Sequence, residues 1–337
     1  MRKIVHPAEL ELLRLIRQRA GAGPRSAIAV GIGDDCALLR PRPGEEIAVT
    51  TDLSIDGRHF RIDWHTPESV GHRVLARGLS DLAAMGARPL AAFLSLGLPA
   101  GLTVGRNSGS GSKSWADRFY DGLLALAALH QTPLAGGDLA ESPVALADIV
   151  LVGAVPRNRA LLRSGAHPGD ALYVTGTLGG AAAGLQALSQ LTPAKRTRIT
   201  ALNCPAALAA HLFPQPRLAQ GAWLQRHKSA TAAIDISDGL STDLTHLCEE
   251  SGLAAEIDAA CLPIAPGATL AQALHGGEDY ELLFTAPASG RLPRRVADVP
   301  IARIGRMVRR RKQDPQITLL TGNAPQPLTP RGWQHFV

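Results

Sequence analysis

Five short segments of the chain each end an apolar run in a turn rich in glycine and acidic residues. They are GIGDD at 31–35, TTD at 50–52, AGGD at 135–138, DISDG at 235–239 and GGED at 276–279. Clustered carboxylates beside backbone that glycine leaves accessible are what hard divalent cations and nucleotide phosphates require. The recurrence therefore predicts an enzyme that handles phosphate with the help of a metal ion.

The acidic residues carry this prediction as a set. Taken singly, an aspartate beside glycine is ordinary turn chemistry, and Asp81 or Asp238 can equally cap or end a helix. Taken together, like charges at converging strand ends repel strongly unless cations neutralise them. Oxygen ligands without histidine or cysteine favour magnesium over zinc. The set comprises Asp34, Asp35, Asp52, Asp81, Asp138, Asp235 and Asp238, with the hydroxyls of Thr50, Thr51 and Ser237.

Two familiar nucleotide motifs do not fit the chain. In GIGDDC, Cys36 stands where a dinucleotide fingerprint needs its third glycine. In SGSGSKS, Ser112 replaces the glycine that precedes the lysine of a phosphate-binding loop. A nucleotide must therefore be held in another way. Arg163 is a candidate partner for its phosphates, and it reads equally well as a surface arginine before a turn.

Short apolar runs alternate with helical periodicity along the chain, which predicts layered α/β structure in two domains, 1–155 and 156–337. We expect the acidic turns to follow strand ends, a first helix after Pro7, and a flexible surface loop within 101–114. Expected helices cover 67–85, 115–129 and 240–251. Expected strands cover 27–31, 47–51, 90–98, 147–155, 171–174, 232–236, 255–257, 280–284 and 301–308.

Composition narrows the class of protein. The chain has 337 residues, 45% of them hydrophobic, and no apolar run approaches the roughly 18 residues of a membrane span. Charged residues interrupt the N-terminal segment where a signal peptide needs an apolar core. Four scattered cysteines suit a reducing compartment. Only 4% of residues are aromatic, so a net charge of +6 suits a polyanionic small substrate better than nucleic acid. We expect a cytoplasmic protein that binds neither membrane nor nucleic acid.

Eight ordered segments together resemble thiamine-monophosphate kinase, in the superfamily of aminoimidazole-ribonucleotide synthetase and selenophosphate synthetase. The resemblance runs from the first helix almost to the C-terminus. The segments are GIGDDCALL, TTDLSIDGRHF, GLSDLAAMGARP, AGGD, LLRSGAHPGDALYVTGTLG, AIDISDGLSTDL, GGEDYELLFT and RGWQHF.

The resemblance implies transfer of the γ-phosphoryl group of ATP to thiamine monophosphate, with several Mg²⁺ ions. It implies metal ligands at Asp35, Thr50, Thr51, Asp52, Asp81, Asp138, Asp235 and Asp238, with Asp52, Asp138 and Asp238 as the catalytic ones. It implies ATP contacts at Tyr120, Gly137, Asp138, Arg163 and Ser237.

For thiamine monophosphate, the resemblance implies contacts at His59, Glu278 and Trp333. An imidazole suits a phosphate, a carboxylate complements the amino-bearing thiamine, and an indole stacks on a cationic ring. Each also has a simpler interpretation: His59 as a loop histidine, Glu278 as a turn residue and Trp333 as an aromatic residue that packs the tail. The resemblance further implies a homodimer in which the N-terminal strands of two subunits join, and a C-terminal domain that closes over the nucleotide.

Two alternatives of different kinds stay open. One is another ATP-dependent enzyme of the superfamily, although no reactive cysteine with a nearby lysine precedes GIGDD and the chain ends in HFV, without a cysteine tail. The other is a dimer that binds nucleotide or magnesium without catalysis. The pattern of ADP release with different acceptors separates the two.

Overall fold

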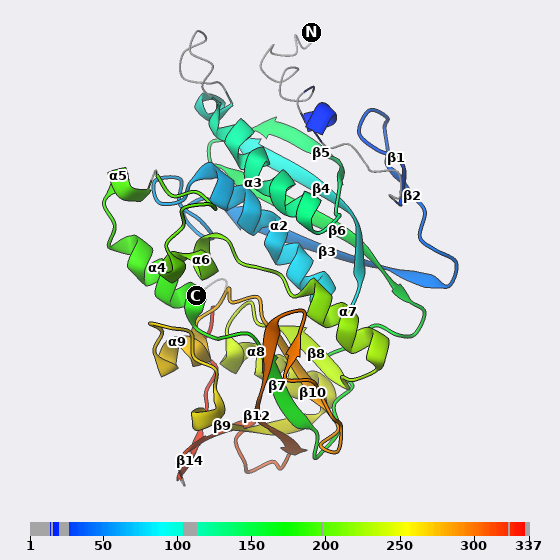
Figure 1. Cartoon of the computed structure of the whole chain (residues 1–337), viewed down its shortest axis with the longest axis vertical. Helices are drawn as coiled ribbons and strands as arrows, with labels where there is room; N and C mark the ends of the chain where they lie inside the picture. Colours follow the sequence, from blue (N-terminus) through cyan, green and yellow to red (C-terminus); the bar gives the residue numbers. More distant parts are fainter. Residues whose placement is uncertain are drawn as a thin grey trace. The chain divides into compact units, whose positions relative to one another are not determined.

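The computed structural model in Figure 1 describes residues 14, 16–19, 27–103, 113–196, 198–322 and 324–333, which fall into two units. The N-terminal unit comprises Met1–Gly78, Pro89–Ala154 and Leu191–Cys204, and the C-terminal unit comprises Leu79–Arg88, Val155–Gln190 and Pro205–Val337. Most of the expected first helix and of the glycine- and serine-rich loop lies outside the described residues.

The N-terminal unit is built on a four-stranded sheet with the strand order β3-β6-β4-β5. A separate two-stranded sheet pairs β1 with β2. The elements of this unit are β1 (Ile28–Val30), β2 (Leu38–Leu39), β3 (Glu45–Ile55), α2 (Pro67–Ala84), β4 (Arg88–Leu98), η1 (Ala100–Leu102), α3 (Trp115–Leu129), β5 (Leu134–Glu141), β6 (Leu146–Pro156) and α5 (Pro193–Arg196), of which α2, β4 and β6 run past its bounds.

Helices α2 and α3 pack closely against each other beside this sheet (Figure 1). A Cβ at Gly71 would stand 1.9 Å from the carbonyl oxygen of Phe119, and one at Gly122 would stand 1.9 Å from that of Glu68. Only glycine permits such an approach of two helix backbones. Helix α3 starts at a capping box, in which Ser114 Oγ accepts from the Asp117 amide and Asp117 Oδ2 accepts from the Ser114 amide.

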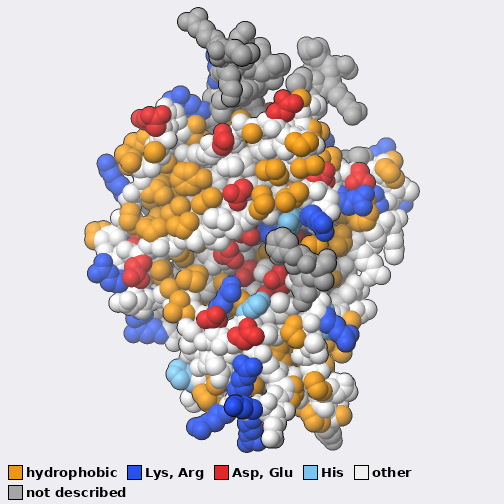
Figure 2. Space-filling model, turned by 180° about the vertical axis from the view of Figure 1, so that it is seen from behind, with side chains coloured by type: hydrophobic (Ala, Val, Ile, Leu, Met, Phe, Trp, Pro, Cys, Tyr) orange, Lys and Arg blue, Asp and Glu red, His pale blue; other side chains and the backbone are white. Residues whose placement is uncertain are grey.

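Strand β3 lies at one edge of the sheet. Its apolar side chains are exposed, whereas polar side chains on its other face are partly buried. Alternate side chains of a strand point to opposite faces. Ile47, Val49 and Leu53 are 47%, 61% and 46% exposed, whereas Thr50 and Asp52, on the other face, are partly buried. Figure 2 shows hydrophobic side chains gathered on the surface of this unit. An outward apolar face on an edge strand is a feature that needs an explanation.

The C-terminal unit is built on a second sheet with the order β14-β13-β9-β12-β7-β10-β8, and β11 pairs with β12. Neighbours are antiparallel except β13 and β9, which run parallel. Its strands are β7 (Ala171–Thr175), β8 (Ala232–Asp235), β9 (Leu253–Asp258), β10 (Leu282–Ala286), β11 (Arg295–Val296), β12 (Val299–Arg309), β13 (Ile317–Thr321) and β14 (Ala324–Pro327). Its helices are α4 (Gly180–Ser189), α6 (Ala206–Leu212), α7 (Leu218–His227), α8 (Leu240–Ser251), η2 (Ala259–Cys261) and α9 (Leu270–His275).

The core of this unit lies between the sheet and helix α8. Leu240, Leu244 and Leu247 of α8 are fully buried and belong to one cluster with Leu172 and Leu283 of the sheet. The i, i+4, i+7 spacing of the three leucines is that of one helix face. The core therefore fixes the start of α8, which directly follows the DISDG segment.

The structure corrects two expectations about strand ends. Asp52 lies inside β3 and Asp138 inside β5, because backbone pairing continues through the polar residues that end each apolar run. Strand β10 starts at Leu282 and not at Tyr280, since Tyr280 has φ +50°, which no strand accommodates. Among the described residues, no helix is long and apolar enough to span a membrane.

Candidate active site

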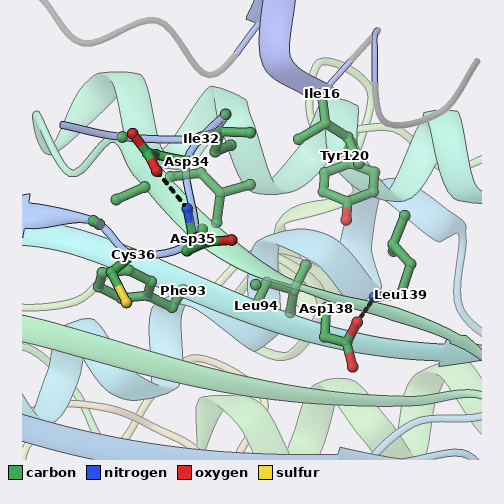
Figure 3. Close-up of a pocket in the computed structure, with 17 residues that line it drawn as sticks. Ile16, Ile32, Asp34, Asp35, Cys36, Phe93, Leu94, Tyr120, Asp138 and Leu139 are labelled. Carbon is green, nitrogen blue, oxygen red and sulfur yellow. Dashed lines mark hydrogen bonds between the residues drawn. The ribbon is translucent and has the colours of Figure 1, made fainter. Parts of the chain in front are cut away.

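A cavity of about 490 Å³ lies in the N-terminal unit, between the GIGDD loop and strand β5 (Figure 3). It brings together five of the candidate residues predicted from the sequence, namely Asp34, Asp35, Tyr120, Gly137 and Asp138. The remaining walls are mostly apolar and come from the GIGDD segment with Cys36 and Ala37, from β4 and β5, and from Ile16. A mostly apolar cavity with a few carboxylates at its rim is the usual form of a site for a small molecule.

Gly137 determines the shape of one wall of the cavity. It has φ +147°, and a Cβ there would stand 1.9 Å from the carbonyl oxygen of Leu94 on the neighbouring parallel strand β4. Strand β5 therefore passes β4 at a distance that only glycine allows. The result is a stretch of backbone without a side chain, facing a cavity.

The carboxylates of this cavity are exposed and locally oriented. Asp34 Oδ1 accepts a hydrogen bond of 2.9 Å from the amide of Asp35, which shapes the turn, and Asp138 Oδ1 accepts one of 2.9 Å from the amide of Leu139. Asp35 and Asp138 both lie on the surface. Tyr120 is 2% exposed, and burial raises the pKa of its hydroxyl, so it remains neutral. Carboxylate oxygens at the rim of the cavity suit a cation better than an apolar ligand.

Strand β3 presents Thr50 and Asp52 on one face and Thr51 on the other. Asp52 Oδ1 lies 3.4 Å from Arg77 Nη2, and Arg77 also donates a 3.2 Å hydrogen bond to Ser54 Oγ. The described residues that line the cavity include none of these. The side chain of Thr51 therefore points away from those of Thr50 and Asp52. A ligand held by Thr50 and Asp52 would meet only the backbone of Thr51.

His59 follows β3 and is held in one orientation. The amide of Ile55 donates a 3.1 Å hydrogen bond to Nδ1 of His59. The backbone carbonyl of His59 accepts a 3.2 Å hydrogen bond from Arg73 Nη2. Because Nδ1 accepts, the proton of the neutral ring lies on Nε2. The ring therefore presents a hydrogen-bond donor.

In the C-terminal unit, the DISDG segment leaves strand β8 and enters helix α8. Asp235 is 3% exposed, and its Oδ2 accepts a 2.7 Å hydrogen bond from Ser80 Oγ, beside Asp81 on the last turns of α2. Ser237 and Asp238 follow in the turn and are partly buried. The buried Asp235 and the partly exposed Asp238 therefore have different surroundings.

Two distant segments are hydrogen-bonded to this turn. The amide of Glu278 donates a 2.7 Å bond to the carbonyl of Ser237, and the amide of Trp333 donates a 3.1 Å bond to the carbonyl of Asp238. A Cβ at Gly332 would stand 2.1 Å from that carbonyl of Asp238, so the tail is in close contact here. The structure thus brings together Ser237, Asp238, Glu278 and Trp333. Arg163 is exposed in the loop after β6, where its carbonyl accepts from Ser251 Oγ.

Comparisons with known proteins match both units. Residues 33–155 match the model of the AIR synthase related protein, N-terminal domain, and residues 167–316 match that of its C-terminal domain. Thiamine-monophosphate kinase of Salmonella typhimurium is 40% identical over 290 residues, covering 83% of this chain and 82% of that protein. The chain belongs to the thiamine-monophosphate kinase family.

Solved structures of the family agree with this membership. The crystal structure of thiamine-monophosphate kinase from Stenotrophomonas maltophilia K279a has a TM-score of 0.74 and 36% identity, covering 93% of this chain and 95% of that one. The structure described as AaThiL complexed with AMPPCP and TMP has a TM-score of 0.72 and 30% identity, covering 97% of both chains. The fold is therefore that of the family across both units.

This member of the thiamine-monophosphate kinase family has an acidic residue beside the DISDG turn that our sequence analysis missed. Asp243 is 2% exposed, and its Oδ2 accepts hydrogen bonds of 3.1 and 3.0 Å from the amides of Asp238 and Gly239. Burial, with the charges of Asp235 and Asp238, raises the pKa of Asp243 to about 8. Its signal in the sequence was an aspartate in the first turn of the helix that follows DISDG.

The donor chemistry fits a magnesium ion held partly by other ligands. Within either unit, the described residues contain no group of three or more His, Cys, Asp or Glu side chains placed to hold an ion. Magnesium typically keeps several waters and takes one or two carboxylates together with substrate phosphates. The exposed Asp35 and Asp138 at the cavity provide ligands of that kind.

Asp279, next to Glu278, gives the protein a measurable pH dependence. Burial raises the pKa of Asp279 from 3.8 to about 7, and hydrogen bonds from the amides of Ala181 and Gly179 oppose this rise. The folded chain therefore holds this proton more tightly than the unfolded chain. The resulting stability is fully present below about pH 4 and is lost as the pH rises through 7.

Asp279→Asn is therefore expected to gain stability relative to the wild type when the pH is raised from 5 to 8. Urea unfolding without magnesium or nucleotide measures the difference in unfolding free energy at each pH. Asp63→Asn is the control whose difference should not change with pH, because Arg61 lowers the pKa of that exposed carboxyl from 3.8 and the group stays ionised between pH 5 and 8. An Asp279→Asn difference that is the same at both pH values would contradict the burial of an ionisable group here.

Proposed function

We propose that this chain transfers the γ-phosphoryl group of ATP to the phosphate of thiamine monophosphate, giving thiamine diphosphate and ADP. The observation that carries the proposal is the cavity of the N-terminal unit, which collects Asp35, Tyr120, Gly137 and Asp138 in a chain of this family. The related AaThiL is described in complex with AMPPCP, an ATP analogue, and TMP, and we take ATP and thiamine monophosphate as the two substrates here.

We place ATP in that cavity. Tyr120 is a neutral aromatic wall for the adenine, and the bare backbone at Gly137 lets a phosphate or ribose approach without a side chain in the way. Asp138 follows Gly137 on strand β5 and also lines the cavity. From the C-terminal unit we assign the exposed guanidinium of Arg163 and the hydroxyl of Ser237 to the phosphates. Removing water around these groups strengthens their electrostatic effect on the transferring group.

We assign the magnesium ions to oxygen ligands of both units. When bound, magnesium would neutralise the negative charge that develops on the phosphates during transfer. The residues that would hold it are Asp35, Thr50, Thr51, Asp52, Asp81, Asp138, Asp235 and Asp238, with Thr51 acting through its backbone carbonyl. Of these, Asp52, Asp138 and Asp238 are the ones we place nearest the reacting phosphates.

The acceptor side of the reaction makes modest demands on the chain. A phosphate oxygen is already ionised at neutral pH, so no strong general base is required. His59 presents Nε2–H as a donor to that phosphate, because Ile55 occupies its Nδ1. Glu278 accepts from the amino group of the thiamine, and Trp333 stacks on its ring. Both lie on segments that are hydrogen-bonded to the DISDG turn.

We further propose that the protein is cytoplasmic and that it has two domains, 1–155 and 156–337. We also propose that it forms a homodimer, in which the second copy covers the apolar face of β3. Ile47, Val49 and Leu53 form that face, on a strand at the edge of its sheet. Pairing of two such edges both satisfies backbone groups and buries apolar surface. The free cysteines Cys36, Cys204, Cys248 and Cys261 suit the reducing cytoplasm.

Val49→Glu is expected to convert the dimer to a monomer, because the new charge would have to be buried against the second copy. Light scattering coupled to gel filtration measures the mass of each variant. Leu202→Glu is the matched control, since Leu202 is fully exposed in the same unit and lies outside β3. A Val49→Glu protein with the mass of the wild type would contradict the proposed interface.

ADP release with a panel of acceptors tests the proposed function. We expect release that requires both magnesium and thiamine monophosphate, and little release with thiamine or with no acceptor. Release without any acceptor would indicate a different ATP-dependent reaction. The absence of release with every acceptor would indicate a protein that binds nucleotide without catalysis.

A further inference from the structure

We propose that the ion pair between the partly buried Arg217 and the buried Glu281 is a positioning device for the substrate contact Glu278. The proposal rests on the proposed function, because it assigns a role relative to the bound thiamine monophosphate. Neither residue belongs to the five glycine- and acid-rich segments of the sequence. Neither contacts the cavity of the N-terminal unit.

The backbone that carries Glu278 is held in an unfavourable conformation. Glu278 has φ +69° and Tyr280 has φ +50°, so two non-glycine residues of three adopt the left-handed region. Each such residue costs about 1 kcal/mol and persists only where its surroundings enforce it. Something in the structure must therefore hold this segment in place.

Backbone hydrogen bonds align the segment with the DISDG turn. The amide of Glu278 donates to the carbonyl of Ser237 over 2.7 Å, and the amide of Tyr280 donates to the carbonyl of Ile236 over 2.9 Å. The amide of Ile236 donates in return to the carbonyl of Glu281 over 2.8 Å. Any shift of the segment therefore moves Glu278 relative to the neighbouring Asp238.

Asp279 anchors the middle of the segment on helix α4. Its Oδ2 accepts a 2.6 Å hydrogen bond from the amide of Gly179, and its Oδ1 accepts a 3.0 Å bond from that of Ala181. These amides lack partners within the helix, so the carboxylate satisfies them. The side chain of Asp279 points into the protein as a result, and Oε2 of the neighbouring Glu278 lies 3.7 Å from Nδ1 of the buried His211.

The pair Arg217–Glu281 anchors the end of the segment. Glu281 is 3% exposed, and its two oxygens accept from Arg217 Nε over 2.6 Å and Nη2 over 2.5 Å. Thr175 Oγ1 donates a further 2.7 Å bond to Glu281 and accepts one of 2.8 Å from the amide of Leu282. The Glu281 carboxylate packs closely on Gly176, because a Cβ at position 176 would stand 1.9 Å from Glu281 Oε1.

A two-pronged arginine bond sets an angle as well as a distance. If the arginine is removed, Glu281 is left as a buried charge with one hydroxyl partner, and it must move toward water or take up a proton. Either response releases the end of the segment, and the left-handed residues then relax. The pair therefore acts on the substrate through Glu278 without touching it.

Arg217→Met tests the proposal, with Arg217→Lys as the conservative variant. Arg306→Met is the matched control, because Arg306 forms an exposed pair in the same unit, 2.6 Å from Glu256 Oε2. For Arg217→Met we expect the KM for thiamine monophosphate to rise by roughly tenfold to a hundredfold, the change that a displacement of about 1 Å produces. Arg217→Lys is expected to fall between Arg217→Met and the wild type.

Hydrogen exchange without ligands supplies a second readout. The amides of residues 276–282 are expected to lose protection in Arg217→Met and to keep it in Arg306→Met. A folded Arg217→Met protein with wild-type KM and wild-type protection would overturn the positioning role. Wild-type protein that releases no ADP with thiamine monophosphate would instead overturn the proposed function, so the two failures are distinguishable.

Discussion

Asp138→Ala is expected to lower turnover about a thousand-fold or more while leaving the fold intact. Asp138 is exposed at the edge of the cavity, and its Oδ1 accepts a hydrogen bond from the adjacent amide of Leu139. Its removal therefore leaves no buried group without a partner. What disappears is a carboxylate that we assign to the cation and the nucleotide. Steady-state ADP release and circular dichroism together measure both effects.

Glu141→Ala is the matched control for this change. Glu141 is an exposed acidic residue of the same strand β5 and does not line the cavity. It is expected to keep wild-type activity. Asp52→Ala is expected to behave like Asp138→Ala. Near-normal activity in a soluble Asp138→Ala protein would refute the assignment of the carboxylates.

Gly137→Ala is expected to lower the unfolding free energy by about 3 kcal/mol and to abolish binding of ATP. The new Cβ would stand 1.9 Å from the carbonyl oxygen of Leu94, and the φ of +147° is itself unfavourable for alanine. Strand β5 must then move away from β4 and into the cavity. Urea unfolding and calorimetric titration with ATP measure the two losses.

Gly44→Ala separates the two causes. Gly44 has φ +81°, but nothing lies within 4 Å of a Cβ placed there, so only the dihedral penalty remains. We expect it to lose about 1 kcal/mol and to bind ATP normally. A Gly137→Ala protein that binds ATP as tightly as the wild type would show that the nucleotide lies elsewhere.

Periodicity predicted the long helices of this fold well. Helix α3 and helix α8 have the bounds expected from the sequence, and α2 ends one residue before its predicted end, with Gly86 at φ +65° beyond it. These elements bury one face each, so their spacing of leucines and alanines is visible in a single sequence. The short helices α6 and α7 and the strands β13 and β14 have no such signal and were missed.

The candidate site was predictable in composition and less so in geometry. The residue types of Asp138 and Gly137 were informative, but their place inside a strand depends on pairing with β4, which lies far away in the sequence. The opposite directions of Thr50 and Thr51 likewise follow from the pairing of β3. Local sequence carries hydrophobicity, whereas register and partner strands are tertiary properties.

The residues that support the site were the least predictable part. Arg217 lies 64 positions from Glu281, and only the folded chain shows that the two form a pair. The left-handed φ of Glu278 similarly contradicts local preference, as expected where surrounding structure enforces a conformation. Sequence patterns locate groups that touch a ligand more readily than groups that hold them in place.

The most direct test of the central claim is to follow the labelled γ-phosphoryl group of ATP in the presence of magnesium and thiamine monophosphate. The proposed reaction predicts that the label appears in thiamine diphosphate, one molecule for each ADP released. ADP released with the label in inorganic phosphate, or with no labelled thiamine diphosphate, would contradict it.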